Sequence, residues 1–369
     1  MSVSTIVSRN ILNALAFKTN RKILIIESDD WGSIRMPSKQ AYKKLLEKDL
    51  IDENDPFLKY DSLESEQDLV GLFEVLSSVK DKNGNHAQVT ANCIMANPDF
   101  DKIQQNGYQD YYFEKANDTF KKYPNHSRGI DLWLEGSDKK VFKPQLHGRE
   151  HVNIGLWMNE IKNPMSKYRE SFELGTFAIN SQIVEALARN THAINDLNPS
   201  NTVQEASVMF KELFDKESIS FIAPNYTWDS GIEETLKKVG IDFLQGSKRQ
   251  NLKKENGEKK SIHHYTGQKN KINQTYLVRN CLFEPSVSSK IDYLDICLKQ
   301  IENAFYWKTP AIITSHRLNY LGGLVEKNRS NNLKLLKRLL DTVIKKWPDI
   351  EFMSTDELCQ LIRKSETDA

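Results

Sequence analysis

The stretch KILIIESDDWGS, residues 22–33, joins an apolar run directly to two adjacent aspartates. Its run of four branched apolar residues, 23–26, is typical of a strand in a parallel sheet, where both faces of the strand are covered. Asp29 and Asp30 follow at once, and a protein core accepts a carboxylate only where another group compensates its charge. The aspartates therefore mark either a solvated turn or a site that pairs them or holds a metal ion.

Similar apolar runs alternate with helical patterns along the chain. The runs that predict further strands are residues 88–95, 140–146, 218–223, 310–315 and 350–354. Apolar residues spaced by three and four predict helices over residues 66–79, 231–240 and 331–347. This alternation predicts the α/β class, with a parallel sheet that is open or closed into a barrel.

Composition excludes several classes of protein. The 369 residues include 51 basic and 50 acidic ones, so no overall charge bias favours nucleic acid or an anionic membrane. We see no apolar stretch of about eighteen residues, the length that a membrane span needs. Residues 1–22 resemble an amphipathic helix more than a signal peptide, which favours a cytoplasmic location. The four cysteines are scattered without a Cys-x-x-Cys pair and are expected to be reduced core residues: Cys93, Cys281, Cys297 and Cys359.

The chain is expected to form a single domain, residues 1–369, with a core over about 22–355. We see neither an internal repeat nor a Pro-rich or Gly/Ser-rich linker that would divide it. Residues 248–271 are rich in lysine and poor in apolar residues, so they predict an inserted solvated loop, with binding of an acidic polymer as the alternative. His263 and His264 lie in this stretch and are expected to be solvated.

Four predicted strands are each followed by polar residues. Asp29 and Asp30 follow the first, and the sequences HGREH (147–151), PNYTWD (224–229) and HRLNY (316–320) follow three others. In parallel α/β folds the carboxyl ends of the strands meet at one rim, where ligands bind. The four clusters are therefore expected to meet there.

His147 and His151 have the spacing of a metal-binding pair. In a helical turn, residues four apart lie on one face, so both imidazoles could reach one zinc ion about 2.0–2.1 Å away. A third, anionic ligand is still needed. Either Asp29 or Asp30 could supply it, which leaves the other as a base for a bound water molecule.

In their order, these motifs resemble those of the polysaccharide deacetylases, carbohydrate esterase family 4. The chain has ESDD, HGREH, APNY and ITSH where the family has Thr-Phe-Asp-Asp, His-(Ser/Thr)-x-x-His, an Arg-x-Pro-Tyr-like motif and Leu-x-His. The resemblance spans about residues 22–355 and implies a distorted (β/α) barrel. It also implies roles: Asp29 is the catalytic base, the backbone at Tyr226 contributes to an oxyanion hole, and His316 is the general acid. The metal ligands that it implies for a divalent ion, expected to be zinc, are Asp30, His147 and His151.

The sequence departs from the family at several positions. Glu27 and Ser28 replace Thr-Phe, and Gly148 stands where Ser or Thr is usual. Ala223 replaces the arginine that orients the catalytic aspartate, so either Arg149 or Arg317 takes over that role or the base is held less well.

The residues predict removal of an acetyl group from an N- or O-acetylated carbohydrate, since this hydrolysis needs a metal ion, a base and an acid. Aromatic residues beside the motifs could stack on sugar rings. The expected substrate contacts are Trp31, Arg149, Tyr226, Trp228 and Arg317.

Two other functions remain open. HGREH also matches His-x-x-Glu-His, the inverted zinc-peptidase motif with Glu150 as base, but that motif requires a long helix, and Pro144 and Gly148 disfavour one. Alternatively, the chain is a non-catalytic carbohydrate-binding protein on the same fold. Asp29 and His316 argue against this alternative, because binding needs neither a base nor an acid.

Overall fold

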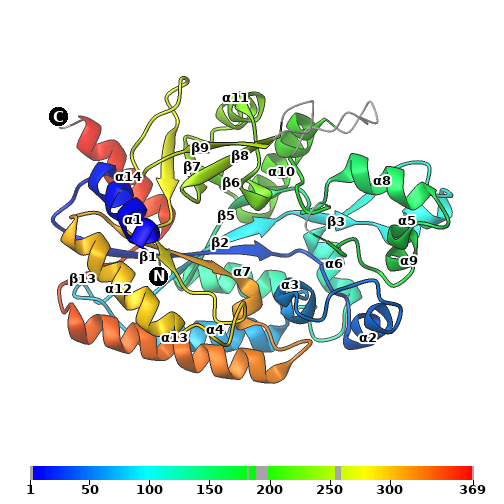
Figure 1. The fold of residues 1–369 in the computed structure, drawn as a ribbon, viewed down its shortest axis with the longest axis horizontal. Coiled ribbons are helices and arrows are strands. Elements are labelled where there is room, and N and C mark those ends of the chain that lie inside the picture. The colour runs from blue at the N-terminus through cyan, green and yellow to red at the C-terminus, as the bar shows by residue number, and fades with distance from the viewer. Residues whose placement is uncertain (1–2, 181–182, 188–197, 254–258, 368–369) are drawn as a thin grey trace.

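Strand β1 (Lys22–Trp31) lies inside a curled, nine-stranded parallel sheet (Figure 1). The computed structural model describes residues 3–180, 183–187, 198–253 and 259–367. Across the sheet, the strand order is β10 (Thr275–Val278), β7 (Phe243–Gly246), β6 (Ser220–Ile222), β5 (Phe142–Gly148), β2 (Val89–Ile94), β1, β12 (Ala311–His316) and β11 (Cys281–Leu282). The ninth strand, β13 (Ile350–Phe352), pairs with the first residues of β1.

Both faces of β1 are buried, as its apolar sequence predicts. Leu24 and Ile26 belong to the main hydrophobic cluster, whereas Ile23 and Ile25 point to a smaller cluster on the opposite face. The helices that contribute to the main cluster include α4 (Glu66–Ser77), α7 (Gly129–Asp138), α10 (Pro199–Phe214), α11 (Ser230–Lys238), α12 (Tyr293–Tyr306) and α13 (Glu326–Lys346). Helix α14 (Thr355–Thr367) closes the smaller cluster.

A separate hydrophobic cluster lies beyond the carboxyl ends of the strands, on the right of Figure 1. It is built from α2 (Lys39–Glu47), α5 (Phe100–Gln105), α8 (Ile154–Lys162), α9 (Lys167–Phe172) and residues 177–179, 183 and 184. The short helix α3 (Pro56–Tyr60) contributes Leu58 to this cluster and also contacts the turn η2 (Arg317–Tyr320) after β12. These elements therefore stand over the rim where the predicted polar clusters lie.

The remaining elements are short or peripheral. They are α1 (Val3–Leu15), α6 (Ala116–Lys122), the turn η1 (Pro224–Tyr226), the antiparallel pair β3 (Ala96–Pro98) and β4 (Phe113–Lys115), and the antiparallel pair β8 (Arg249–Lys253) and β9 (Lys259–His263). No helix in the part of the chain that the structure describes is long and apolar enough to cross a membrane. All four cysteines are buried and free, as predicted.

The predicted strands and helices are confirmed, but the lysine-rich stretch 248–271 is not simply a solvated loop. Its β8 and β9 form a hairpin, in which Arg249 pairs with His263. His264 is buried, its ring stacks 3.6 Å from that of Tyr276, and its Nε2 lies 2.8 Å from Gln250 Oε1. The prediction of a solvated His264 is therefore wrong, whereas His263 is exposed. Because charge dominated this stretch, its strand pairing was not visible in the sequence.

Candidate active site

A bulge at the end of β1 brings two consecutive carboxylates to one side of the sheet. In a regular strand, neighbouring side chains point to opposite faces. Here the pairing between β1 and β2 shifts register between Ser28 and Trp31, and Asp30 has a φ of 75°. Such a bulge re-aims side chains at the end of a strand. As a result Asp29 and Asp30 both line the same cavity.

A second bulge places the histidines. The pairing of β5 with β2 skips His147, because Cys93 pairs with Leu146 and the next residue of β2 pairs with Gly148. Gly148 has a φ of 125°, a conformation that favours glycine and explains why no Ser or Thr stands there. Residues 147–151 are thus the end of a strand and a loop, and the helical turn that the spacing suggested is not formed.

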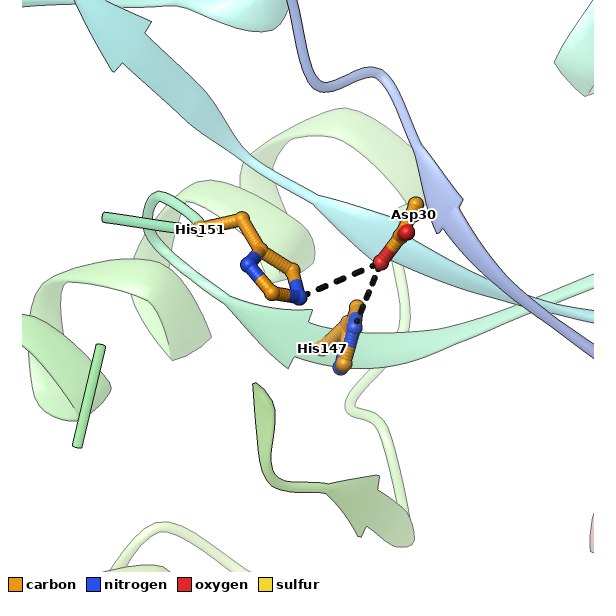
Figure 2. Close-up of side chains that lie close together, drawn as sticks. All are labelled: Asp30, His147 and His151. Atoms are coloured by element: carbon orange, nitrogen blue, oxygen red, sulfur yellow. Dashed lines mark hydrogen bonds and ion pairs between the residues drawn. The ribbon is translucent and has the colours of Figure 1, made fainter. Parts of the chain in front are cut away.

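Asp30, His147 and His151 form one buried cluster (Figure 2). The Nε2 atoms of both histidines lie 3.2 Å from the same oxygen, Asp30 Oδ1. His147 Nδ1 lies 2.8 Å from the carbonyl oxygen of Ile222, which can only accept, so Nδ1 carries a proton and Nε2 is the nitrogen that can bind a metal ion. A cation between Asp30 Oδ1 and the two Nε2 atoms could bind all three.

The cluster fits a divalent metal ion. Zinc lies about 2.0–2.2 Å from imidazole nitrogen and carboxylate oxygen, so two tetrahedral ligands are about 3.3 Å apart, close to the 3.2 Å seen here. Burial lowers the pKa of His151, which keeps the imidazole neutral as a ligand must be. The second oxygen of Asp30 lies 3.2 Å from Arg35 Nη2, an outer contact that orients the carboxylate.

Asp29 is held by Arg279, a residue that the sequence analysis missed. Arg279 Nη1 and Nη2 lie 2.6 Å from Asp29 Oδ2 and Oδ1, and Nε lies 2.6 Å from Glu27 Oε2. Asn92 Nδ2 donates a further hydrogen bond to Asp29 Oδ1 at 2.8 Å. Burial alone would raise the pKa of the Asp29 carboxyl, but the guanidinium of Arg279 outweighs it and lowers this pKa to about 2. Asp29 is therefore ionised throughout the neutral range.

The two arginines expected to replace the family's arginine serve elsewhere. Arg149 binds Glu150 at 2.5 Å, and Arg317 is fully buried against Asp61 and Glu64 at 2.9 and 2.6 Å. Neither contacts Asp29. That expectation is wrong, although one signal was present: Arg279 directly follows the apolar run of β10 and thus lies at the same rim.

His316 faces Asp29 and is held from behind by Glu284. Its Nε2 lies 3.7 Å from Asp29 Oδ2, and its Nδ1 lies 2.6 Å from Glu284 Oε1. Burial disfavours the charged imidazole, but Glu284 outweighs burial and raises the pKa of His316 to about 9. His316 is therefore protonated at neutral pH, with Nε2–H toward the cavity.

These ion pairs form two chains, each of which contains one of the two adjacent aspartates. One runs from Glu27 through Arg279, Asp29 and His316 to Glu284, and the other from Asp30 through Arg35, Asp61 and Arg317 to Glu64.

A cavity of about 160 Å³ joins these groups. Asp29, Asp30, His147, His151 and His316 line it from the sheet. The elements above the rim close it with polar and apolar side chains, which include Asp55, Phe57, Leu58, Ala178, Asn180 and Val184. The rim residues were predicted to meet, and the structure brings them together around one space large enough for an acyl group.

Tyr226 lines this cavity, but its backbone N–H already donates a hydrogen bond within the protein. It donates to the carbonyl of Ala223 at 2.9 Å, within a turn where both Asn225 and Tyr226 have positive φ. The Tyr226 hydroxyl instead lies 3.4 Å from Arg279 Nη1. The expected oxyanion contact from this N–H is therefore not available in this conformation.

The other aromatic residues expected to bind sugar do not line this cavity. Trp31 is fully buried, edge-on to Phe142 at 5.1 Å and stacked on Tyr320 at 6.4 Å. Trp228 is buried and donates to Glu233 Oε1 at 3.1 Å. Both rings pack in the core, so the roles expected for them as sugar platforms are not supported.

Comparison with known proteins gives a likeness of fold. Neither a protein-family model nor a curated protein matches the sequence. Among solved structures, PuuE allantoinase is 9% identical and has a TM-score of 0.50 over 93% of this chain and 91% of its own. A protein provisionally named as a polysaccharide deacetylase from Mycobacterium smegmatis is 11% identical, with a TM-score of 0.45 over 95% and 94%. A CE4 family pseudoenzyme from Bacillus anthracis is 9% identical, with a TM-score of 0.38 over 92% and 66%.

At identities this low, the likeness concerns the fold alone. The curled, parallel sheet of this chain agrees with that likeness. The chain therefore has a distorted (β/α) barrel fold, which it shares with PuuE allantoinase and which its motifs predicted.

Proposed function

We propose that this protein is a metal-dependent hydrolase that removes acetyl groups from an N- or O-acetylated carbohydrate. One observation carries the proposal: an ionised aspartate, a protonated histidine and a cluster of residues that could hold a metal ion line a single cavity. A binding protein needs neither the clamp of Arg279 on Asp29 nor that of Glu284 on His316. The carbohydrate part of the proposal rests on the resemblance of the motifs.

In this proposal Asp30, His147 and His151 hold the metal ion, with zinc expected. Such an ion, when bound, lowers the pKa of water to about 7 and polarises a carbonyl group. Asp29 takes up the proton of the attacking water. With a pKa of about 2, Asp29 is too weak a base for ordinary water, so its chemistry depends on the occupied metal site.

His316 supplies the proton that the leaving amine or alkoxide needs. Its Nε2–H points to the cavity, while Glu284 accepts from Nδ1 and keeps the ring charged. The small apolar part of the cavity, formed by Leu58, Ala178 and Val184, can receive the methyl group of an acetyl substituent.

The peptidase alternative loses its structural basis. It requires Glu150 to act as base from a helix that includes both histidines. Here residues 147–151 are not helical, and Glu150 is buried in an ion pair with Arg149.

The deciding experiment measures acetate release from a panel of N- and O-acetylated oligosaccharides, together with the metal content of the same sample. Release that is lost on chelation and restored by a divalent ion supports the proposal. A sample with one metal equivalent that binds these sugars but releases no acetate would instead identify a non-catalytic binding protein.

We expect His316→Ala to keep the metal and to slow hydrolysis of natural acetyl substrates by about 10²- to 10⁴-fold, the usual effect of losing a general acid. The loss should be smaller for an aryl acetate, because its leaving group needs no proton. Steady-state kinetics on both substrates test this difference. His263→Ala, at an exposed histidine, is the control. Equal slowing of both substrates would contradict the role of His316 as acid.

The pH profile of the rate should depend on Glu284. Because the acid must be protonated, activity should fall as pH rises through the pKa of His316, about 9. Glu284→Gln removes the carboxylate that raises this pKa, so the alkaline limb should move to lower pH. Profiles of kcat/KM for the two proteins measure the shift. An unchanged alkaline limb would show that His316 does not produce it.

A further inference from the structure

A second cavity lies on the other side of helix α3 from the candidate active site. Its volume is about 420 Å³, and it is formed by α3, residues 285–290 and the start of α13. In α3, Phe57 and Leu58 line the active-site cavity, whereas Pro56, Lys59 and Tyr60 line the second one. A single short helix therefore separates the two spaces.

Three lysines give the second cavity its charge: Lys59, Lys290 and Lys327. We call this cavity the lysine groove. Within the part of the chain that the structure describes, the three amino groups have neither an ion pair nor a hydrogen bond, although Lys59 Nζ lies 5.9 Å from the centre of the Tyr60 ring. Many surface lysines of this protein, in contrast, pair with a carboxylate. Glu53 is the one acidic residue among those that line the groove. Clustered, unpaired positive charge in a concave surface attracts an anion.

The rest of the groove offers hydroxyl and amide groups. Ser288, Ser289 and Asn331 are at least partly accessible, and Tyr60 adds a half-buried aromatic ring. Such groups suit a ligand that carries many hydroxyls as well as negative charge, because each can donate or accept hydrogen bonds.

The wall of the groove is connected to the candidate acid, His316, through neighbouring residues and hydrogen bonds. Glu284, which holds His316, directly precedes the groove residues 285–290. Asn319 donates to Glu284 Oε2 at 2.7 Å and accepts from the backbone N–H of Ser286 at 3.0 Å. The groove is therefore fixed in position relative to the reacting groups.

We propose that the lysine groove binds carboxylate, sulfate or phosphate groups of a saccharide chain whose acetylated unit occupies the active-site cavity. This inference rests on the proposed function and narrows its substrate to anionic oligo- or polysaccharides. A helix with its side chains is about 10–12 Å across. A ligand that reaches past α3 must therefore be longer than a single sugar ring.

Binding of anionic oligosaccharides without acetyl groups tests the groove separately from catalysis. Three probes are anionic: an oligogalacturonide, which carries carboxylates, a sulfated oligosaccharide and a phosphorylated oligosaccharide. The neutral probe is a fully N-formylated chito-oligosaccharide of equal length. Binding of each probe is measured by calorimetric titration. We expect at least one anionic probe to bind at least tenfold more tightly than the neutral one. This preference should weaken from about 0.05 to about 0.5 M salt, since salt screens exposed charges.

The triple variant Lys59→Gln/Lys290→Gln/Lys327→Gln should bind the anionic probe about tenfold more weakly, because each exposed ion pair gives up to a few-fold in affinity. The matched control is Lys44→Gln/Lys121→Gln/Lys238→Gln, which removes three exposed lysines elsewhere and should bind as the wild type does. Equal losses in the two triple variants, or no preference for anionic probes, would overturn the inference. In that case, acetate release from neutral substrates would still support the proposed function. Conversely, binding of anionic probes in the groove without acetate release from any substrate would refute the proposed deacetylase function but not the groove.

Discussion

Replacing Asp30 by alanine should remove the metal ion and abolish acetate release. The two imidazoles converge on Asp30 Oδ1, so this substitution deletes the anionic ligand and leaves His147 and His151 as a neutral pair. It also leaves Arg35 without one of its two carboxylate partners, next to an incoming cation. Metal analysis after gel filtration and competition with a coloured chelator measure the loss of affinity.

Thermal unfolding gives a readout that does not depend on activity. A ligand that binds the folded state alone stabilises it by about 2.7 kcal/mol at a concentration of 100 Kd. Zinc should therefore raise the Tm of the wild type and of the control His263→Ala, but leave that of Asp30→Ala unchanged. Metal binding by Asp30→Ala with wild-type affinity would show that the cluster is not the metal site.

The position of the rim residues could be predicted, because it follows from general rules of parallel sheets. Polar residues that follow apolar runs must meet where the strands end, and so Asp29, His147 and His316 were expected close together. These rules require only that the strands are located correctly in the sequence and that they run parallel to one another. They do not need side-chain detail.

The partners that give those residues their chemistry could not be predicted in the same way. Arg279 lies 250 positions from Asp29, and Glu284 lies 32 positions from His316. Which of many arginines reaches a given carboxylate depends on strand order, which one sequence alone does not give. The apolar run of β10 could place Arg279 at the rim but not next to Asp29, and β11, which precedes Glu284, has only two residues. The missing arginine at Ala223 was visible, but its replacement was not.

The local backbone geometry of the metal-binding pair could not be predicted from the sequence either. The spacing of His147 and His151 correctly suggested a metal pair, but a bulge in β5 and the positive φ of Gly148 bring the rings together in place of a helical turn. A bulge of one residue leaves no clear mark in hydrophobic periodicity, because it reverses the alternation at a single point. Local geometry at the end of a strand thus required the structure.

Asp29→Asn should keep the metal and reduce turnover by about 10⁴-fold, the upper end of what a general base contributes. The amide preserves the shape of the side chain and can still accept from Asn92, but it cannot take up a proton from water. Unlike Asp30→Ala, this variant should bind zinc with wild-type affinity. Turnover and metal content of the same sample measure the two effects.

Arg279→Gln separates the clamp from the base itself. Without the guanidinium, the burial of the Asp29 carboxyl is less well compensated, so the pKa of Asp29 should rise, and the base must be ionised to act. The rate should then fall as pH decreases through this raised pKa and recover at higher pH, whereas Asp29→Asn stays slow at every pH. Arg149→Gln, which removes an arginine that does not contact Asp29, should show no new acid limb. If Arg279→Gln and Arg149→Gln gave the same pH profile, Asp29 would not be the base, because its ionisation would not govern the rate.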